Sequence, residues 1–174
     1  MGVHCAITYD CPTAYHAHDF PLTIPPALVD PGLVMLTVEE SAHYPLLGDL
    51  SDDEWLSLTS AGVGYVRLGP DQRRFVVTMF HEMHCLRVLN LAIGGSSRAS
   101  MDHVTHCLNY LRLMALCSAD ITLESGDFMA RDFSTEHIGE TRVCRDWTAV
   151  YSAMHDNYAE WLNSTTRVSD SLFS

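Results

Sequence analysis

The sequence has little positive charge, and this restricts the partners that it can bind. Its 174 residues include 10 Lys plus Arg against 22 Asp plus Glu, which gives a formal net charge of −12. Nucleic acids and anionic membrane surfaces attract clusters of Lys and Arg side chains. The charge balance therefore argues against both kinds of partner. A glycine-rich phosphate loop is also missing, which argues against a nucleotide cofactor.

Long hydrophobic runs are absent as well. A membrane-spanning helix needs about 20 consecutive apolar residues, and a secretory signal places an apolar run after a charged segment. Neither pattern occurs, so we expect no membrane segment in this chain, and the sequence alone assigns no location. The six cysteines and the glycosylation sequon at residues 163–165 point toward the secretory-pathway lumen or secretion.

The composition and the periodicity predict a mainly α-helical fold with short strands and long irregular segments. Hydrophobic residues make up 47% of the chain, enough for one globular domain over residues 1–174. Prolines at 21, 25, 26 and 31 block a regular helix in residues 1–32, which we expect to form an extended N-terminal arm. The core is then expected over residues 51–162.

Apolar residues at helical spacing predict three long helices, over about 72–92, 101–118 and 146–162, and a short one beginning at Ser51. Because residues 94–97 read Gly-Gly-Ser-Ser, the first two long helices should form a helical hairpin. Apolar, β-branched runs predict short strands at residues 33–38 and 62–68, whereas residues 125–143 should be irregular.

One pattern occurs twice, once in each helix of the predicted hairpin. Residues 81–85 and residues 103–107 both read His-x-x-His-Cys. Residues three and four apart share a face of a helix, so each copy projects two imidazoles and a thiol to one side. Helices meeting through these faces would bring four imidazoles together, from His81, His84, His103 and His106. A simple antiparallel hairpin leaves them offset by several ångströms at about 1.5 Å per residue, unless the helices cross or the link folds back.

The imidazoles and thiols allow different kinds of site. Neutral imidazole binds copper, zinc and iron, and four histidines without a thiolate leave positions open for oxygen or substrate. That arrangement is typical of a catalytic site. If Cys85 and Cys107 were also ligands, the six side chains could form a structural zinc site. We favour disulfides, within the hairpin or to Cys117 and Cys144, because free thiolates beside a redox copper would be oxidised.

Further residues are weaker candidates. His137, in the region expected to be irregular, could supply an additional metal ligand. His16 and His18 form a His-x-His pair that could chelate a metal, although scattered loop residues are the more common case. Glu82 stands between two motif histidines and could act as a base, but it points off their face, which favours exposure to solvent.

These residues resemble the fungal UstYa-like (ustiloxin-type) oxidase family, over roughly residues 51–162. That family carries two His-x-x-His-Cys motifs, a Cys-x-Ala-Asp-x-Thr-Leu-Glu stretch and a late Cys-Arg-Asp-Trp. Here the last two stand at residues 117–124 and 144–147. Members of the family usually have an N-terminal transmembrane helix, which we do not expect in this sequence, and many have a histidine where this sequence has Arg142. His137 is the candidate replacement for that histidine.

The resemblance implies an oxidase or cyclase of fungal secondary-metabolite (mycotoxin or peptide natural product) biosynthesis, acting on a peptide or other small molecule. Oxidative cyclisation, hydroxylation and halogenation are the reactions that it implies, with copper as the cofactor and zinc or iron as alternatives. A homodimer, or a heterodimer with another family member, is a further implication. The implied site residues are His81, His84, His103 and His106, and the family's four cysteines correspond to Cys85, Cys107, Cys117 and Cys144.

Two other functions fit the same residues. A redox-neutral cyclase would need no metal and would use the histidines as general acid and base near neutral pH. A small module stapled by structural zinc or disulfides would bind a partner enzyme and catalyse nothing. Metal content and a count of free thiols separate these possibilities.

Overall fold

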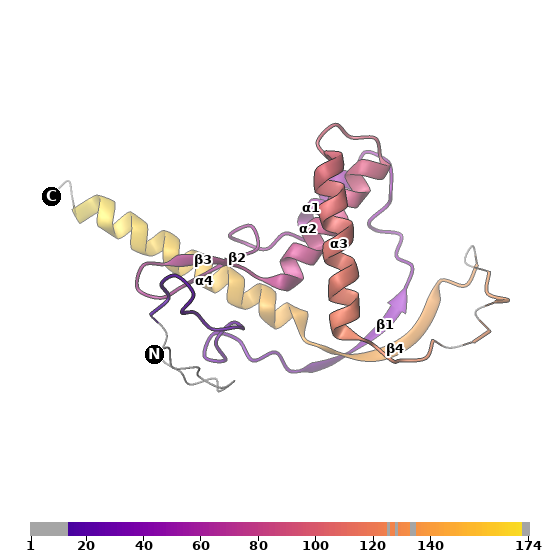
Figure 1. The fold of residues 1–174 in the computed structure, drawn as a ribbon, viewed down its shortest axis with the longest axis horizontal. Helices are drawn as coiled ribbons and strands as arrows, with labels where there is room; N and C mark the ends of the chain where they lie inside the picture. Colours follow the sequence, from indigo (N-terminus) through magenta and orange to yellow (C-terminus); the bar gives the residue numbers. More distant parts are fainter. Residues whose placement is uncertain (1–13, 125, 128, 133–134, 172–174) are drawn as a thin grey trace. The chain divides into compact units, whose positions relative to one another are not determined.

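The computed structural model describes residues 14–124, 126–127, 129–132 and 135–171, without the side chains of residues 166–171 (Figure 1). The chain divides into two compact units. We call residues 33–59 and 78–145 the hairpin unit, and the remaining described residues the terminal unit. Cys5 and Cys11 lie outside the described residues. No described helix combines the length and the apolar character needed to span a membrane.

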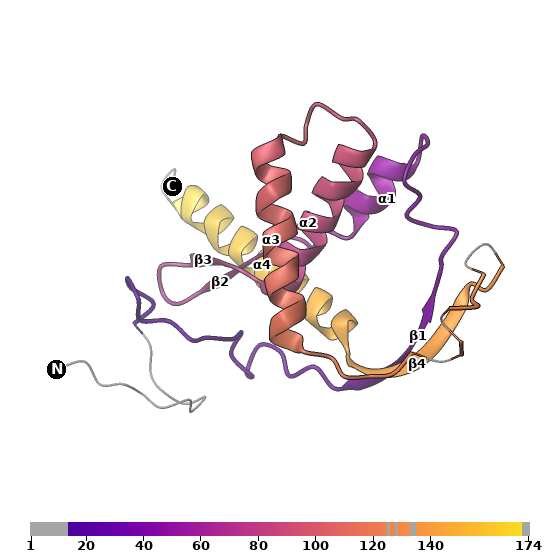
Figure 2. The same cartoon turned by 45° about the vertical axis from the view of Figure 1, so that its right-hand side comes forward.

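The hairpin unit contains the two long helices that carry the His-x-x-His-Cys motifs. Helix α2 spans Thr78–Ile93 and α3 spans Met101–Ser118, and Figures 1 and 2 show them side by side. Ser100 caps α3, since its hydroxyl accepts a hydrogen bond from the backbone N–H of His103 at 3.3 Å. The predicted helical hairpin is confirmed, and α3 has the predicted bounds.

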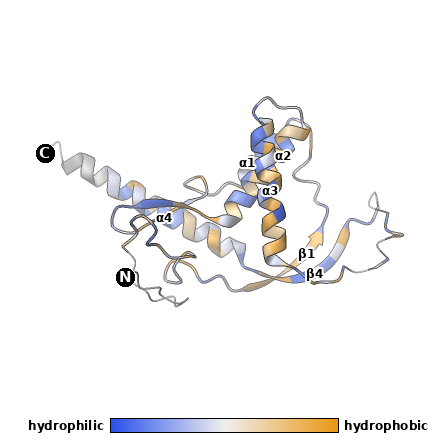
Figure 3. Cartoon of the chain, viewed as in Figure 1, coloured by the Kyte–Doolittle hydropathy of each residue, from blue (hydrophilic) through white to orange (hydrophobic). Residues whose placement is uncertain are grey.

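A small core holds α2 against α3. Its buried members are Cys85, Val88, Val104 and Cys107, and partly buried residues pack around them, namely Leu89, Ala92, Ala99, Tyr110 and Leu111. In Figure 3, hydrophobic residues are concentrated on α3, whereas much of the C-terminal helix is hydrophilic. The two motif cysteines are thus part of the packed seam between the helices.

Helix α1, Ser51–Ser57, is fastened to α2 by polar contacts. The buried Asn90 amide donates to the Leu46 carbonyl at 3.1 Å and lies 3.3 Å from the Ser51 hydroxyl. Asp52 accepts from Arg87 at 2.6 Å and from Arg98, in the loop after α2, at 2.8 Å. These contacts fasten the motif-bearing helix α2 to α1. They involve residues that the apolar periodicity does not reveal.

A two-stranded antiparallel ribbon completes the hairpin unit. Strand β1, Leu33–Glu39, pairs with β4, Ile138–Arg145, in the register Leu33↔Arg145 to Thr37↔Thr141. The hydroxyls of Thr37 and Thr141 are 2.9 Å apart. The first strand was predicted, but the prediction of an irregular segment was wrong for residues 138–143. Strand β4 forms through a partner about a hundred positions away, which no local pattern indicates.

The terminal unit contains a β-hairpin and a long helix. Strands β2, Tyr65–Leu68, and β3, Arg73–Val76, pair from Tyr65↔Val76 to Leu68↔Arg73, and α4 spans Trp147–Ser171. The predicted helix start at residue 72 was wrong, because residues 69–72 form a turn with positive φ at Gly69 and Gln72. Helix α4 begins next to Asp146, whose carboxylate accepts from the Thr148 N–H at 2.9 Å, and it continues beyond residue 162.

The N-terminal arm docks on this β-hairpin. Residues 14–32 contain no helix or strand, as the prolines predicted. Arg73 donates to the carbonyls of Tyr15 at 3.0 Å and Ala17 at 2.9 Å. A Cβ atom on Gly69 would lie 2.6 Å from the Tyr15 ring, so only glycine allows the ring this close.

Asn157 joins α4 to β2 by imitating a neighbouring strand. Its side-chain oxygen accepts from the backbone N–H of Arg67 at 2.8 Å, and its amide donates to the Arg67 carbonyl at 2.8 Å. The Arg67 guanidinium lies 3.9 Å from the centroid of the Trp161 ring. Asn157 therefore satisfies an edge of β2 that would otherwise be unpaired.

We expect Asn157→Ala to destabilise the protein by about 1–3 kcal/mol, because it leaves a partly buried N–H and C=O without partners. Urea denaturation followed by circular dichroism measures the change. Ser152→Ala, on an exposed position of the same helix, is the matched control and should change stability by less than about 0.5 kcal/mol. Equal losses in the two variants would contradict the role given to Asn157.

Candidate functional site

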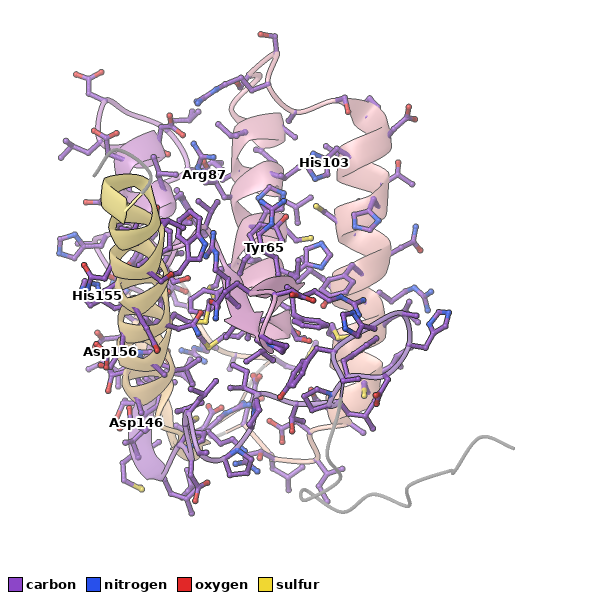
Figure 4. The ribbon with its side chains drawn as sticks, turned by 90° about the vertical axis from the view of Figure 1, so that its left-hand side faces the viewer. Tyr65, Arg87, His103, Asp146, His155 and Asp156 are labelled. Atoms are coloured by element: carbon purple, nitrogen blue, oxygen red, sulfur yellow. The ribbon has the colours of Figure 1, made fainter. Side chains whose placement is uncertain are left out.

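The structure brings the four motif histidines together across the α2–α3 seam. The Nε2 atoms of His84 and His103 are 3.1 Å apart, and those of His81 and His106 are 3.4 Å apart. Figure 4 shows the His103 imidazole in the space between the two helices. Each histidine thus faces one from the other helix, in the order expected for antiparallel neighbours.

The end of α2 explains how the offset expected from a simple hairpin is closed. Gly95 has φ +74°, and the N–H groups of Gly95 and Ser96 donate to the carbonyls of Ala92 at 3.0 Å and Leu91 at 2.9 Å. This is the Schellman pattern, in which a left-handed glycine turns the chain back over the last helical turn. The chain therefore turns back at the end of α2, and Ala99, just before α3, packs against the core between the two helices.

The four rings form two pairs. Across the seam, the ring centroids are 5.1 Å apart for His84–His103 and 5.5 Å apart for His81–His106. Along each helix, the separations are 6.4 Å for His81–His84 and 6.3 Å for His103–His106. His84 and His106 are exposed, whereas His81 and His103 are half-buried. Each cross-helix pair therefore has one solvent-exposed histidine, His84 in one pair and His106 in the other.

Each cross-helix pair has a spacing suited to metal binding. Two nitrogens that bind one tetrahedral ion at about 2.0–2.1 Å lie about 3.3 Å from each other. Both measured Nε2 separations, 3.1 and 3.4 Å, are close to this value. Within the described ranges, no three His, Cys, Asp or Glu side chains are gathered closely enough to hold one ion. The donor chemistry and the spacing within each pair fit a metal such as copper.

The surroundings favour neutral imidazole, the form that binds metals. Burial lowers the pKa of His81, and the nearby His106 and His103 lower it further. Burial and then His103 likewise lower the pKa of His84. Protonating one member of a closely spaced pair would place a positive charge beside the other. Both histidines of α2 are therefore prepared to donate a lone pair near neutral pH.

The motif cysteines lie in the core and do not form the predicted disulfides. Cys85 and Cys107 have no exposed surface, and all four described cysteines are free, so the disulfide-stapled part of the fold prediction was wrong for this structure. Burial, together with a hydrogen bond to Cys107, raises the pKa of Cys85 to about 12. A thiol held protonated is a poor metal ligand, and the packing of the helices accounts for its position.

His137 takes a place apart from the four motif histidines. Its Nδ1 atom is 3.4 Å from the Glu40 carboxylate, and its carbonyl accepts from the Glu40 N–H at 2.8 Å. It therefore closes the end of the β1–β4 ribbon, and no hydrogen bond or ring contact recorded for the described residues joins it to the quartet. His16, in the terminal unit, lies 3.7 Å from Asp71.

Arg142 lies among carboxylates. Its guanidinium pairs with Glu140, with Asp120 at 2.8 Å and with Glu124 at 3.8 Å. Asp120 and Glu124 belong to the segment after α3, so Arg142 ties that segment to β4. The side chain at this position therefore makes an ion-pair network.

Two residues near the site were missed or misjudged from the sequence. Tyr110 lies with its ring centroid 4.0 Å from that of His81; the signal was its position four residues after His106, on the same helical stripe. Glu82 is half-buried and burial raises its pKa, so it is less exposed than its place off the histidine face suggested.

Comparison with known proteins gives consistent matches. Residues 68–157, about half of the chain, match the family described as "Mycotoxin biosynthesis protein UstYa". The chain is 27% identical over 124 residues to "UstYa family oxidase phomYb" of Diaporthe leptostromiformis, covering 60% of this chain and 49% of the relative. It is 27% identical over 125 residues to "Oxidase ustYa" of Aspergillus flavus, covering 61% and 59%.

A third relative, "Oxidase ustYb" of Aspergillus flavus, is 24% identical over 139 residues, covering 56% of this chain and 54% of the relative. The chain thus spans about half the length of the curated relatives that it matches. No solved structure matches significantly.

We expect His81 and His84 of the metal-free protein to titrate below the usual histidine pKa of about 6.5. Because the unfolded chain then binds protons more readily, stability should fall as pH drops through this range. Two-dimensional NMR of the histidine rings gives the pKa values, and thermal melts from about pH 7.5 to 5.5 give the stability. The His81→Asn/His84→Asn double variant should lose part of this dependence. Titration of either histidine above 6.5 would contradict the assignment.

A second prediction concerns the thiols. In the native protein at about pH 8, iodoacetamide should modify the exposed Cys117 and leave Cys85 and Cys107 unmodified, because both are buried and the Cys85 thiol stays protonated. Peptide mass spectrometry measures the extent of modification at each site. In denaturant, all three should react at similar rates. A mass lower by two hydrogens on a peptide pair would instead reveal a disulfide.

Proposed function

Because the chain belongs to the UstYa family of mycotoxin biosynthesis proteins, we propose that it is an oxidase or cyclase of fungal secondary-metabolite biosynthesis that depends on copper. The observation that carries the proposal is the meeting of four imidazoles as two cross-helix pairs, with Nε2 separations of 3.1 and 3.4 Å. Packing alone does not require imidazoles to face each other in this way, since an apolar pair would fill a seam at lower cost.

Copper would be held by His81, His84, His103 and His106, with two imidazoles supplied by each cross-helix pair. A bound copper ion would supply one-electron redox chemistry with oxygen. The rest of the task falls to the chain: α2 and α3 hold the two imidazoles of each pair face to face, and partial desolvation together with the neighbouring imidazoles lowers the pKa of His81 and of His84. The exposed edges of His84 and His106 leave room for a substrate to approach the same centre.

The proposed substrate is a small molecule or peptide, and two observations support this choice. The matching relatives are named as oxidases, and a small molecule or peptide with an oxidisable phenol or C–H bond suits a metal site at an open helix face. Ring closure, hydroxylation or halogenation would each begin with oxidation at that position. An acidic chain with a net charge of −12 does not favour a polyanionic substrate.

A redox-neutral cyclase that needs no metal is the second candidate. It is favoured by the hydrogen-bond distances within the pairs, because a neutral imidazole that donates to its partner can exchange a proton with it. In this case, one histidine would protonate the substrate while another accepts a proton. The ion pairs of Arg142 are compatible with either function.

Loss of the imidazoles provides the test. The purified wild type should contain copper, whereas His84→Ala and His106→Ala should each lower bound copper by at least about tenfold and abolish oxygen consumption with substrate. Elemental analysis and an oxygen electrode measure the two quantities. His155→Ala, at an exposed histidine of α4, is the matched control and should leave both unchanged.

Anaerobic reactions distinguish the two candidates. The oxidase should stop without oxygen or with a strong chelator, and should recover when copper and oxygen are restored. Full turnover under anaerobic conditions with chelator present would refute the oxidase and support the redox-neutral cyclase. The same His84→Ala and His106→Ala variants would then be expected to change the pH profile of the reaction.

A further inference from the structure

Tyr110 is an aromatic residue that contacts the histidine quartet. It stands on α3 four residues after His106, so it extends the stripe of His103 and His106 by one turn. Its ring centroid lies 4.0 Å from that of His81, with an interplanar angle of 34°. From His106 the distance is 6.2 Å, with an angle of 22°. Tyr110 therefore covers one pair from the side.

The opposite side of Tyr110 belongs to the core. The residue is half-buried and packs against the cluster of Cys85, Val88, Val104 and Cys107. It thus lies between the packed seam and the His81–His106 pair, and the core limits its movement. Because the core restricts the Tyr110 ring, this ring can restrict the orientation of the His81 ring that packs against it.

The two histidine pairs differ in this respect. Among the ring contacts of the described part of the chain, Tyr110 touches His81 and His106, while His84 and His103 contact only other histidines of the quartet. The His84–His103 pair has Arg87 nearby instead of a tyrosine. The charge of Arg87 contributes to lowering the pKa of His84, and its guanidinium is held by Asp52. Figure 4 shows Arg87 near α1, away from His103.

We propose that Tyr110 is a positioning residue of the quartet, whose ring fixes the plane of the His81 imidazole so that its Nε2 atom faces that of His106. The torsion that rotates a histidine ring is broad and roughly two-fold, so a ring without such a neighbour samples several orientations. Stacking against a ring anchored in the core selects one of them. The proposal rests on the proposed function in one respect, which is that the His81–His106 pair binds metal.

The first test uses metal-free protein, so that it does not depend on activity or loading. In the wild type, the His81 ring protons should show one set of NMR signals, shifted by the ring current of Tyr110. Tyr110→Leu should remove the shift and broaden or divide these signals, whereas Tyr110→Phe should preserve them. The signals of His84 and His103 should stay in place in both variants.

The second test measures Cu(II) binding by titration calorimetry, with the electron paramagnetic resonance spectrum as a further readout. Removing an outer partner of a metal ligand commonly costs about tenfold or more in affinity. We expect about tenfold weaker binding for Tyr110→Leu, with an altered Cu(II) spectrum, and near wild-type binding for Tyr110→Phe. Leu111→Ala is the matched control, because it removes core packing from the next position of α3.

The outcomes separate the inference from the function on which it rests. Unchanged His81 signals or unchanged copper affinity in Tyr110→Leu would overturn the positioning role, as would an equal loss of affinity in Leu111→Ala. If the wild type binds no Cu(II), the proposed function fails, and the metal-free spectra still decide whether Tyr110 fixes His81. Loss in Tyr110→Leu with rescue in Tyr110→Phe supports the inference.

Discussion

The packing of α2 on α3 is the contact on which the rest of the site depends. The seam is small, and its centre consists of two thiols with no exposed surface and two valines. Because each cysteine directly follows a motif histidine, burying the thiols fixes the rotation of both helices about their axes. The imidazoles, one and four positions before each cysteine, are thereby turned to the edge of the same seam. Each motif thus combines one packing residue, the cysteine, with two histidines that can bind metal. Burial of the cysteine orients the two histidines.

Much of this arrangement could be predicted because it depends on local spacing. The i, i+3 separation of the histidines, the cap at Ser100 and the glycine after α2 are all readable in sequence, and together they predict a hairpin with its donors on one face. The missed strands have a different cause. Strand β4 exists through a distant partner, and Arg73–Val76 reads as the start of a helix until the turn at residues 69–72 folds it back on β2.

The contacts between polar side chains also could not be predicted from the sequence. Nothing in the periodicity shows that Asn90 anchors α1, that Asn157 substitutes for a strand beside Arg67, or that Arg142 gathers three carboxylates. Such contacts join segments that are far apart in the chain. Many polar residues could serve as the partner, so the sequence does not indicate which pairs form. His137 illustrates the consequence: its contact with Glu40 at the end of the β1–β4 ribbon could not be predicted from its residue type.

The net charge and the local environment of the quartet act in opposite directions on its protonation. A chain with a net charge of −12 attracts protons, and this field alone would raise the pKa of every histidine. Solvent screens that field over about 8–10 Å at physiological ionic strength, whereas desolvation and a neighbouring imidazole act at contact distance. At these contact distances, desolvation and the neighbouring imidazoles lower the pKa of His81 and of His84. The seam therefore maintains neutral donors within an acidic protein, and a metal cation approaching the quartet would be attracted by the surrounding charge without competing with protons on these two nitrogens.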